Sequence, residues 1–309
     1  MNSLIKQKIK SIVGKVYSFS PNSSIDIKNH ITIFMFHDVS YESTTLQKKY
    51  FLSVTPDEFI AQLEWIKRNF LIQSPIELLN KKSNLMGSAI ITFDDGYLGT
   101  FKNALPILKV LKIPSLIFLN IGHINKSKPF IPGLVTYLTH NSKKFIKFCE
   151  ENKIKKPFYL YITTTQLRDY SEYNELPSLE EIEKYSGKFA SMNDLNEWEN
   201  ENVFYGNHLY EHWNYFSLSQ EEFIDQYNKN KETLSQFNNH IDIFAFTNGI
   251  HPNLEHSSDL FSKLGTKKIF TISNGFNQTQ NKLILGRVPM TAYEVNDSLR
   301  WYQLYRSNL

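Results

Sequence analysis

Several features that mark other protein classes are missing from this 309-residue chain. It has one cysteine, Cys149, so no internal disulfide can form. No apolar run reaches 18 residues, which excludes an obvious membrane-spanning helix. The net charge is only +3 and no basic block is present, which argues against a nucleic-acid partner. No internal repeat or low-complexity linker divides the chain.

The composition is that of one folded enzyme domain. Hydrophobic residues make up 41% and charged residues 21% of the chain, which is ordinary for a soluble globular protein. The length suffices for a β/α barrel, which often takes about 250 residues. We therefore predict an N-terminal amphipathic segment over residues 1–30, followed by a barrel over residues 31–309.

Residues 1–17 contain aliphatic side chains at helical spacing with lysines between them. The segment lacks the uninterrupted apolar core and small-residue cleavage site of a signal peptide. Two interpretations stay open: a helix packed on the outside of the barrel, and a helix that lies on an anionic membrane surface as a peripheral contact.

Apolar runs alternate with helix-patterned segments in the rest of the chain, which predicts a parallel sheet covered by helices. The interval 121–190 is rich in Lys, Glu and Tyr, with helix-like patches at 134–152 and 178–185, and is interpreted as an insertion over one mouth of the barrel. Strands are expected at 31–36, 88–93, 115–120, 202–205, 241–247, 267–272 and 283–288, and helices at 56–70, 98–111, 219–237 and 254–264.

Two adjacent carboxylates, Asp94 and Asp95, follow the apolar run 88–93 and precede Gly96. Neighbouring side chains at a strand end point in different directions, so one carboxylate can hold a metal while the other handles a proton. A nearby cation would explain why two like charges persist so close together. The alternative is an ordinary turn in which an aspartate caps the next helix.

Two histidines, His208 and His212, stand four residues apart after another short apolar run. On a helical turn they would share one face, a spacing that suits two imidazoles on one divalent ion. Two histidines and one aspartate leave a position open for water or substrate, as in catalytic metal sites. In a chain with nine histidines, such a pair can also arise by coincidence.

Other strand ends carry polar groups as well. His37 follows strand 31–36, Asn248 follows strand 241–247, and Arg287 lies near the end of the last strand. A histidine can act as a general acid near neutral pH, and an arginine can hold a carboxylate ionised. Polar residues just past several strand ends are typical of a β/α barrel active site.

The motif order resembles that of the polysaccharide deacetylases of carbohydrate esterase family 4, closest to poly-N-acetylglucosamine deacetylases. The resemblance covers roughly residues 30 to 290 and rests on the segments FHDV, TFDDGY, GNHxxxH, FAFxxG and GRxP. It implies an irregular (β/α)7 barrel of the α/β class with a helical insertion.

The resemblance also implies roles for individual residues. Asp95, His208 and His212 match the metal-binding triad, Asp94 the catalytic base and His37 the general acid. Tyr97 matches the position whose backbone N–H helps hold the oxyanion, and Arg287 is expected to pair with Asp94. Trp213, beside His212, is a candidate sugar-stacking residue, with a core position as the alternative, and Asn248 is a candidate substrate-binding residue.

Three residues depart from the family pattern. Leu209 stands where Ser or Thr is usual, Trp213 where Pro is usual, and Thr247 where Pro is common. None of them removes a metal ligand or a proton-transfer group. They bear on loop geometry and substrate fit.

The leading hypothesis is a metal-dependent N-deacetylase of amino sugars in a bacterial surface glycan or its lipid-linked precursor. The alternatives are an O-deacetylase, a non-sugar amidohydrolase and an inactive glycan-binding protein. Two imidazoles and a carboxylate suit zinc, with cobalt, nickel and iron as alternatives. Without a recognisable signal peptide, we expect a cytoplasmic enzyme, peripheral to the inner membrane.

Overall fold

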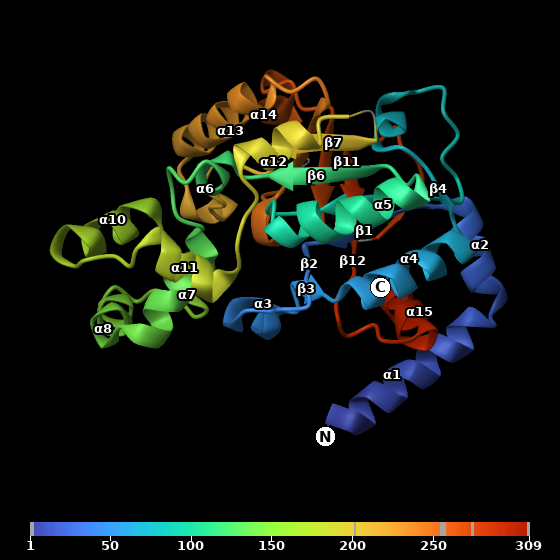
Figure 1. Ribbon diagram of the computed structural model, residues 1–309, viewed down its shortest axis with the longest axis horizontal. Helices are drawn as coiled ribbons and strands as arrows, with labels where there is room; N and C mark the ends of the chain where they lie inside the picture. The colour runs from blue at the N-terminus through green and yellow to red at the C-terminus, as the bar shows by residue number, and fades with distance from the viewer. Residues whose placement is uncertain (1–2, 201, 254–257, 273–274, 308–309) are drawn as a thin grey trace.

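The computed structural model describes residues 3–200, 202–253, 258–272 and 275–307 of the chain. Its centre is a mostly parallel sheet in the order β10-β1-β5-β6-β7-β8-β9-β11, which helices surround (Figure 1). The strands of this sheet are β1 (Ile31–Phe36), β4 (Leu71–Ile72), β5 (Ser88–Phe93), β6 (Ser115–Leu119), β7 (Val203–Asn207), β8 (His240–Ala245), β9 (Lys268–Thr271), β10 (Phe276–Asn277), β11 (Ile284–Gly286) and β12 (Val288–Pro289). A separate small pair joins β2 (Asp38–Val39) to β3 (Ser53–Val54).

The predicted barrel is confirmed, and its last strand is split at Arg287. β11 pairs with β9, whereas β12, one residue later, pairs with β1 in parallel. The sheet thereby returns to its first strand. The central strands are buried along their whole length because helices cover the outside while side chains from opposite strands fill the inside. The predicted irregular (β/α)7 architecture is therefore the observed one.

Most helices that cover the barrel begin at a side-chain cap. Thr55 and Ser219, for example, accept a bond from the backbone N–H three residues later at the starts of α4 and α13. Pro106 does not interrupt a regular helix, because a π-helical turn over Thr100–Ala104 precedes α5 and the proline falls in the first turn of α5. The covering helices are α4 (Pro56–Asn69), α5 (Leu105–Leu111), α12 (Met192–Glu197), α13 (Gln220–Leu234), α14 (Ser258–Lys263) and α15 (Asp297–Arg306).

Between β6 and β7 the chain forms a group of helices beyond the ends of the strands (Figure 1). They enclose a small apolar cluster of their own, which includes Phe145, Cys149 and Trp213. This group consists of α6 (Ile121–Ile124), α7 (Ile131–Asn141), α8 (Lys143–Glu151), α9 (Phe158–Tyr161), α10 (Thr164–Tyr173) and α11 (Leu179–Ser186). Helix α3 (Thr45–Tyr50) lies beside this group, because the rings of Tyr50 and Tyr159 on α9 are 5.5 Å apart, and it contributes Leu46 and Tyr50 to the pocket described below.

The N-terminal segment is helical. Within the predicted N-terminal segment 1–30, residues 3–29 contain α1 (Ser3–Ser18) and α2 (Pro21–Asn29). The predicted helix 254–264 is observed as α14, and its first residues, 254–257, lie outside the described residues. Within the described part of the chain, none of the helices is both long and apolar enough to cross a bilayer.

Candidate metal and catalytic site

Asp94 and Asp95 follow β5 and point to different partners. Asp95 adopts a left-handed backbone conformation with φ 72°, and Gly96 follows with φ 77°. Aspartate tolerates this conformation better than most residues. The sharp turn directs the Asp94 carboxylate toward Arg287 and the Asp95 carboxylate toward two histidines. The strand end thus separates two like charges in the way the sequence had suggested.

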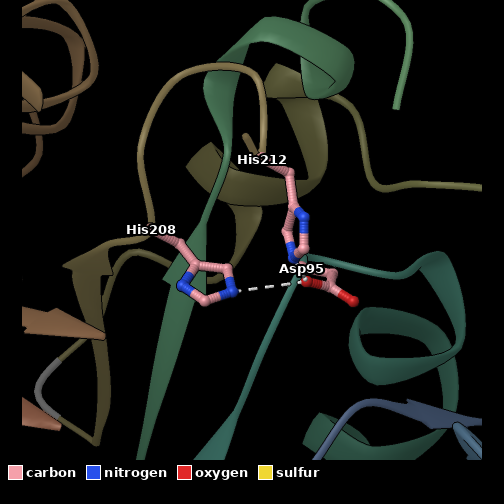
Figure 2. A group of neighbouring side chains, drawn as sticks. All are labelled: Asp95, His208 and His212. Atoms are coloured by element: carbon pink, nitrogen blue, oxygen red, sulfur yellow. Dashed lines mark ion pairs between the residues drawn. The ribbon is translucent and has the colours of Figure 1, made fainter. Parts of the chain in front are cut away.

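Asp95, His208 and His212 converge at the carboxyl ends of the strands (Figure 2). Asp95 Oδ1 lies 3.0 Å from His212 Nε2 and 3.4 Å from His208 Nε2. The ligand atoms all lie within 4.8 Å of one another, and the three residues are buried. Ligands of a tetrahedral zinc ion stand about 3.3 Å apart, given bond lengths of about 2.0–2.1 Å. These residues therefore fit a divalent metal.

The two histidines lie in a loop, and the helical turn expected from their spacing is wrong. Leu209 has φ 65° and His212 has φ 57°, both incompatible with a right-handed helix. The Asn120 side-chain amide holds this loop by donating to the carbonyls of His208 and Leu209, the latter at 3.0 Å. The loop nevertheless brings the Nε2 atoms of both histidines to Asp95. A spacing of four residues places two side chains on one side only in a helix, so here the loop conformation brings the histidines together.

Neighbouring groups hold the candidate metal ligands in place. His208 Nδ1 lies 2.8 Å from the Ala245 carbonyl, which orients its Nε2 toward Asp95. Burial raises the pKa of Asp95, but the adjacent His212 and His208 outweigh burial and hold this pKa well below its usual value. Asp95 is therefore ionised, as metal ligation by a carboxylate requires.

Asp94 is paired with Arg287 in a bidentate contact. Arg287 Nη1 and Nη2 donate to the two carboxylate oxygens at 2.6 and 2.7 Å. The guanidinium is packed against the rings of Phe118 and Phe270. Burial alone would raise the pKa of Asp94, but Arg287 and His208 outweigh it and lower that pKa. The predicted contact between Asp94 and Arg287 is present, and it keeps Asp94 ionised.

His37 follows β1 and lines the same pocket as Asp94 and Asp95. Thr100 Oγ1 donates to the His37 carbonyl at 2.6 Å and anchors its backbone. Burial lowers the pKa of His37, while the carboxylates of Asp95 and Asp94 oppose that shift. An imidazole held opposite two acids at a strand end is in position to pass a proton to a bound substrate.

The comparisons with known proteins agree with this geometry. The sequence model of the polysaccharide deacetylase family matches residues 81–267. The chain belongs to the polysaccharide deacetylase family. No curated protein sequence matches the chain.

The deacetylase shares its fold with solved structures of low sequence identity. IcaB from Ammonifex degensii is 18% identical, with 89% of this chain and 97% of that chain covered and a TM-score of 0.59. PplD from Streptococcus pyogenes, solved in complex with acetate, is 17% identical, with 91% and 98% covered and a TM-score of 0.56. A de-N-acetylase from Aggregatibacter actinomycetemcomitans is 14% identical, with 88% and 99% covered and a TM-score of 0.57.

A pocket of about 310 Å³ opens over the candidate metal site of the deacetylase. Asn248 lines it in a left-handed conformation, and its Nδ2 is buried without a hydrogen-bond partner among the described residues. An unpaired buried donor at a pocket wall favours binding of a substrate oxygen. The lining residues are His37, Leu46, Tyr50, Leu52, Asp94, Asp95, Phe130, Pro132, Tyr159, His208, His212, Asn248, Gly249 and Ile272.

Tyr97 comes two residues after Asp95 and is buried, and its ring lies 6.2 Å from that of Phe130, which lines the pocket. It faces Phe189 in an antiparallel bridge closed by bonds of its neighbours, Leu98 N–H to Lys188 and Ala190 N–H to Gly96. The bridge therefore does not use the N–H of Tyr97. Its ring stacks on Phe189 with centroids 4.8 Å apart, which fixes the backbone at this position.

Trp213 does not line the pocket, so its interpretation as a sugar-stacking residue is wrong. Its ring is buried in the apolar cluster of the helical insertion, and its Nε1 donates to Glu211 at 3.3 Å. Tyr50 and Tyr159 occupy the pocket wall in its place, with ring centroids 5.5 Å apart. Sequence reasoning missed these tyrosines because they belong to α3 and α9 and do not directly follow a barrel strand in the sequence.

The three departures from the family pattern have structural explanations. Leu209 packs into the apolar cluster around Phe223 and Tyr227. Thr247 Oγ1 donates to the Trp213 carbonyl at 2.5 Å, so two of the departures bond to each other. Sequence reasoning also missed Asn120, which holds the histidine loop. Asn120 directly follows β6, so the expectation that polar residues just past the strand ends belong to the site could have identified it.

Proposed function

We propose that this protein is a metal-dependent hydrolase that removes N-acetyl groups from amino sugars of a bacterial surface glycan or its lipid-linked precursor. One observation carries the proposal. Asp95 lies against two histidine Nε2 atoms, while the adjacent Asp94 is held by Arg287 and faces the same pocket. A metal site and a separate ionised carboxylate in one cavity is the arrangement that amide hydrolysis needs.

The metal would be held by Asp95, His208 and His212. When bound, a divalent ion would lower the pKa of water and polarise the acetyl carbonyl. Two imidazoles and one carboxylate favour zinc, with cobalt, nickel and iron as the alternatives to test. The pairing of His208 Nδ1 with Ala245 supports this assignment, because metal-ligating histidines usually donate their second nitrogen in this way.

Proton transfer is assigned to the two remaining titratable groups. Asp94 accepts a proton from the attacking water, and Arg287 keeps that carboxylate ionised between turnovers. His37 delivers a proton to the amine nitrogen as the C–N bond breaks. Water adds to the acetyl carbon, so the products are acetate and a free amino sugar.

Two neutral donors complete the proposed site. The Tyr97 N–H, which its bridge to Phe189 leaves unused, would bond the oxyanion that forms on the acetyl oxygen. The Asn248 amide would bond a sugar hydroxyl or the acetyl group. Each well-placed oxyanion donor contributes roughly 3–4 kcal/mol to the stability of the transition state.

The pocket walls support a sugar substrate. Tyr50 and Tyr159 present aromatic surface with polar tips, the kind of side chain that packs on a pyranose ring while bonding its hydroxyls. Structures of similar fold include a de-N-acetylase and a deacetylase bound to acetate, the product expected here. These names agree with N-acetyl hydrolysis on this scaffold.

The test is acetate release from N-acetylglucosamine oligomers by purified protein, with and without a chelator. We expect activity that the chelator abolishes and that added zinc or cobalt restores, and no activity in an Asp94→Asn variant. Faster release from acetyl esters than from N-acetyl sugars would favour an O-deacetylase. A protein that neither retains nor regains a divalent metal would support the glycan-binding alternative.

A further inference from the structure

Helix α1 packs against the body of the protein with its small and polar face. A Cβ on Gly14 would lie 1.8 Å from the Ser298 carbonyl oxygen, so the backbones of α1 and α15 are in direct contact. Lys10 Nζ lies 4.6 Å from the centre of the Tyr293 ring. Tyr17 contacts the ring of Trp301 at 6.0 Å between centroids. These contacts set one side of α1 against α15 (Figure 1), so the other side faces outward.

The outward face of α1 is aliphatic, the reverse of a normal surface helix. Four aliphatic residues on this face, which are named below, follow one another at spacings of four, three and four residues, and this spacing places them in one stripe along the helix. They are 46–66% exposed, and Phe19, just beyond the helix, is 80% exposed. The stripe consists of Ile5, Ile9, Ile12 and Val16, and we call it the α1 stripe. A folded protein rarely leaves such a row in water without a partner.

Exposed lysines border the α1 stripe. By helical spacing, Lys8 and Lys15 lie along one side of the stripe and Lys6 along the other. The sequence of α1 contains no acidic residue. A second copy of this chain docked stripe to stripe would bring lysines near lysines, with no carboxylate on the helix to pair them. A surface of negative charge with an apolar interior meets both the lysines and the stripe.

We infer that the α1 stripe docks on the headgroup region of an anionic lipid bilayer, with Lys6, Lys8 and Lys15 against the lipid phosphates and the aliphatic side chains below them. Because α1 packs closely on α15 at Gly14, docking of the stripe would hold the whole barrel at the membrane surface. This inference does not depend on the proposed chemistry. It gives the enzyme a location where a lipid-linked glycan would be within reach.

The test is flotation of the full chain with vesicles of phosphatidylcholine, with or without phosphatidylglycerol. We expect binding only to the anionic vesicles, weakened by salt. An Ile12→Gln/Val16→Gln variant should bind at least roughly tenfold more weakly, because both side chains leave the apolar layer. Lys8→Gln should lower binding roughly fivefold. The matched control is Val110→Gln on α5, where an 82% exposed valine has no place in the stripe and binding should not change.

Three results would overturn the inference. One is no binding to anionic vesicles, and another is equal binding by wild type and the Ile12→Gln/Val16→Gln variant. The third is a dimer in sedimentation velocity that this variant dissociates, which would identify a second copy as the occupant. All variants should release acetate from soluble oligomers as wild type does, so failure here and failure of the proposed chemistry are separable. The cytoplasmic location expected from the sequence stays a prediction that cell fractionation tests.

Discussion

Arg287 donates to both carboxylate oxygens of Asp94, at 2.6 and 2.7 Å, in the interior of the barrel, where both residues are buried. Arg287 lies between β11 and β12, where the last strand is split and the barrel closes, and Asp94 directly follows β5. The ion pair therefore connects the site of barrel closure to the end of β5. One contact therefore links barrel closure to the ionisation of the proposed base. Neither partner can be changed without leaving the other buried and uncompensated.

Arg287→Met should lower the free energy of unfolding by about 3–5 kcal/mol, because it leaves the Asp94 carboxylate buried without its partner. Urea unfolding measures this change. An Asp94→Leu/Arg287→Met variant should recover much of the loss in stability and remain inactive. The matched control is Arg68→Met, which breaks an exposed pair with Asp297 and should cost no more than about 1 kcal/mol. Equal effects of both single variants would contradict the role given to the buried pair.

Metal binding should depend on each of the three proposed ligands. In Asp95→Asn, His208→Gln and His212→Gln, we expect loss of bound zinc by elemental analysis and loss of the stabilisation that zinc gives in thermal unfolding. A ligand present at 100 times its Kd stabilises a protein by about 2.7 kcal/mol. Asp94→Asn should keep the metal while losing activity. His240→Gln, at the amino end of β8, serves as the control and should bind zinc normally.

Stability should fall as pH rises from about 4 to about 6 through the titration of Asp38. Burial raises the pKa of this carboxyl from 3.8 to about 6, and its bond from Gln47 Nε2 at 2.7 Å only partly offsets burial. The folded state therefore binds the proton more tightly than the unfolded state, so ionisation above pH 6 costs about 2–3 kcal/mol. Asp38→Asn should remove this slope in urea titrations, whereas Asp225→Asn, at an exposed position of α13, should not.

The bond between Thr247 and the Trp213 carbonyl should position the loop that carries His212. Thr247→Val keeps the shape of the side chain and removes the donor, so we expect a loss of about 1–3 kcal/mol in stability and weaker metal binding. Thr247→Ser keeps the hydroxyl and is the matched control. If valine and serine behave alike in zinc titrations, the hydrogen bond does not position the ligand loop.

Several strands could be predicted from the sequence because they are buried along their whole length and consist mainly of apolar residues. β1 and β5 match their predicted ranges for this reason. The conformation of the histidine loop could not be predicted, because it depends on left-handed backbone at Leu209 and His212 and on Asn120, which lies 88 residues before His208. A spacing of four residues marks the two histidines as candidate metal ligands, but it does not distinguish a helix from such a loop.

The position of the Trp213 side chain is a second feature that could not be predicted from the sequence. Its position beside a metal ligand suggested the pocket, yet the helical insertion supplies an apolar cluster that takes the ring instead. The position of that cluster depends on how α7, α8 and α10 pack together, which no local pattern reveals. The aromatic wall is built from Tyr50 and Tyr159, whose meeting requires the complete fold.

Tyr159 should therefore govern substrate binding more than chemistry. Tyr159→Ala removes one side of the aromatic wall while leaving Asp94, His37 and the metal ligands in place. We expect the KM for N-acetylglucosamine oligomers to rise roughly tenfold with little change in kcat, since stacking contributes equally to bound substrate and transition state. Hydrolysis of a small acetyl ester, which is too short to reach the wall, should be unaffected. Tyr173→Ala, at an 85% exposed position on α10, controls for the loss of a tyrosine from the insertion. A fall in kcat on both substrates would instead place Tyr159 among the groups that organise the reacting atoms.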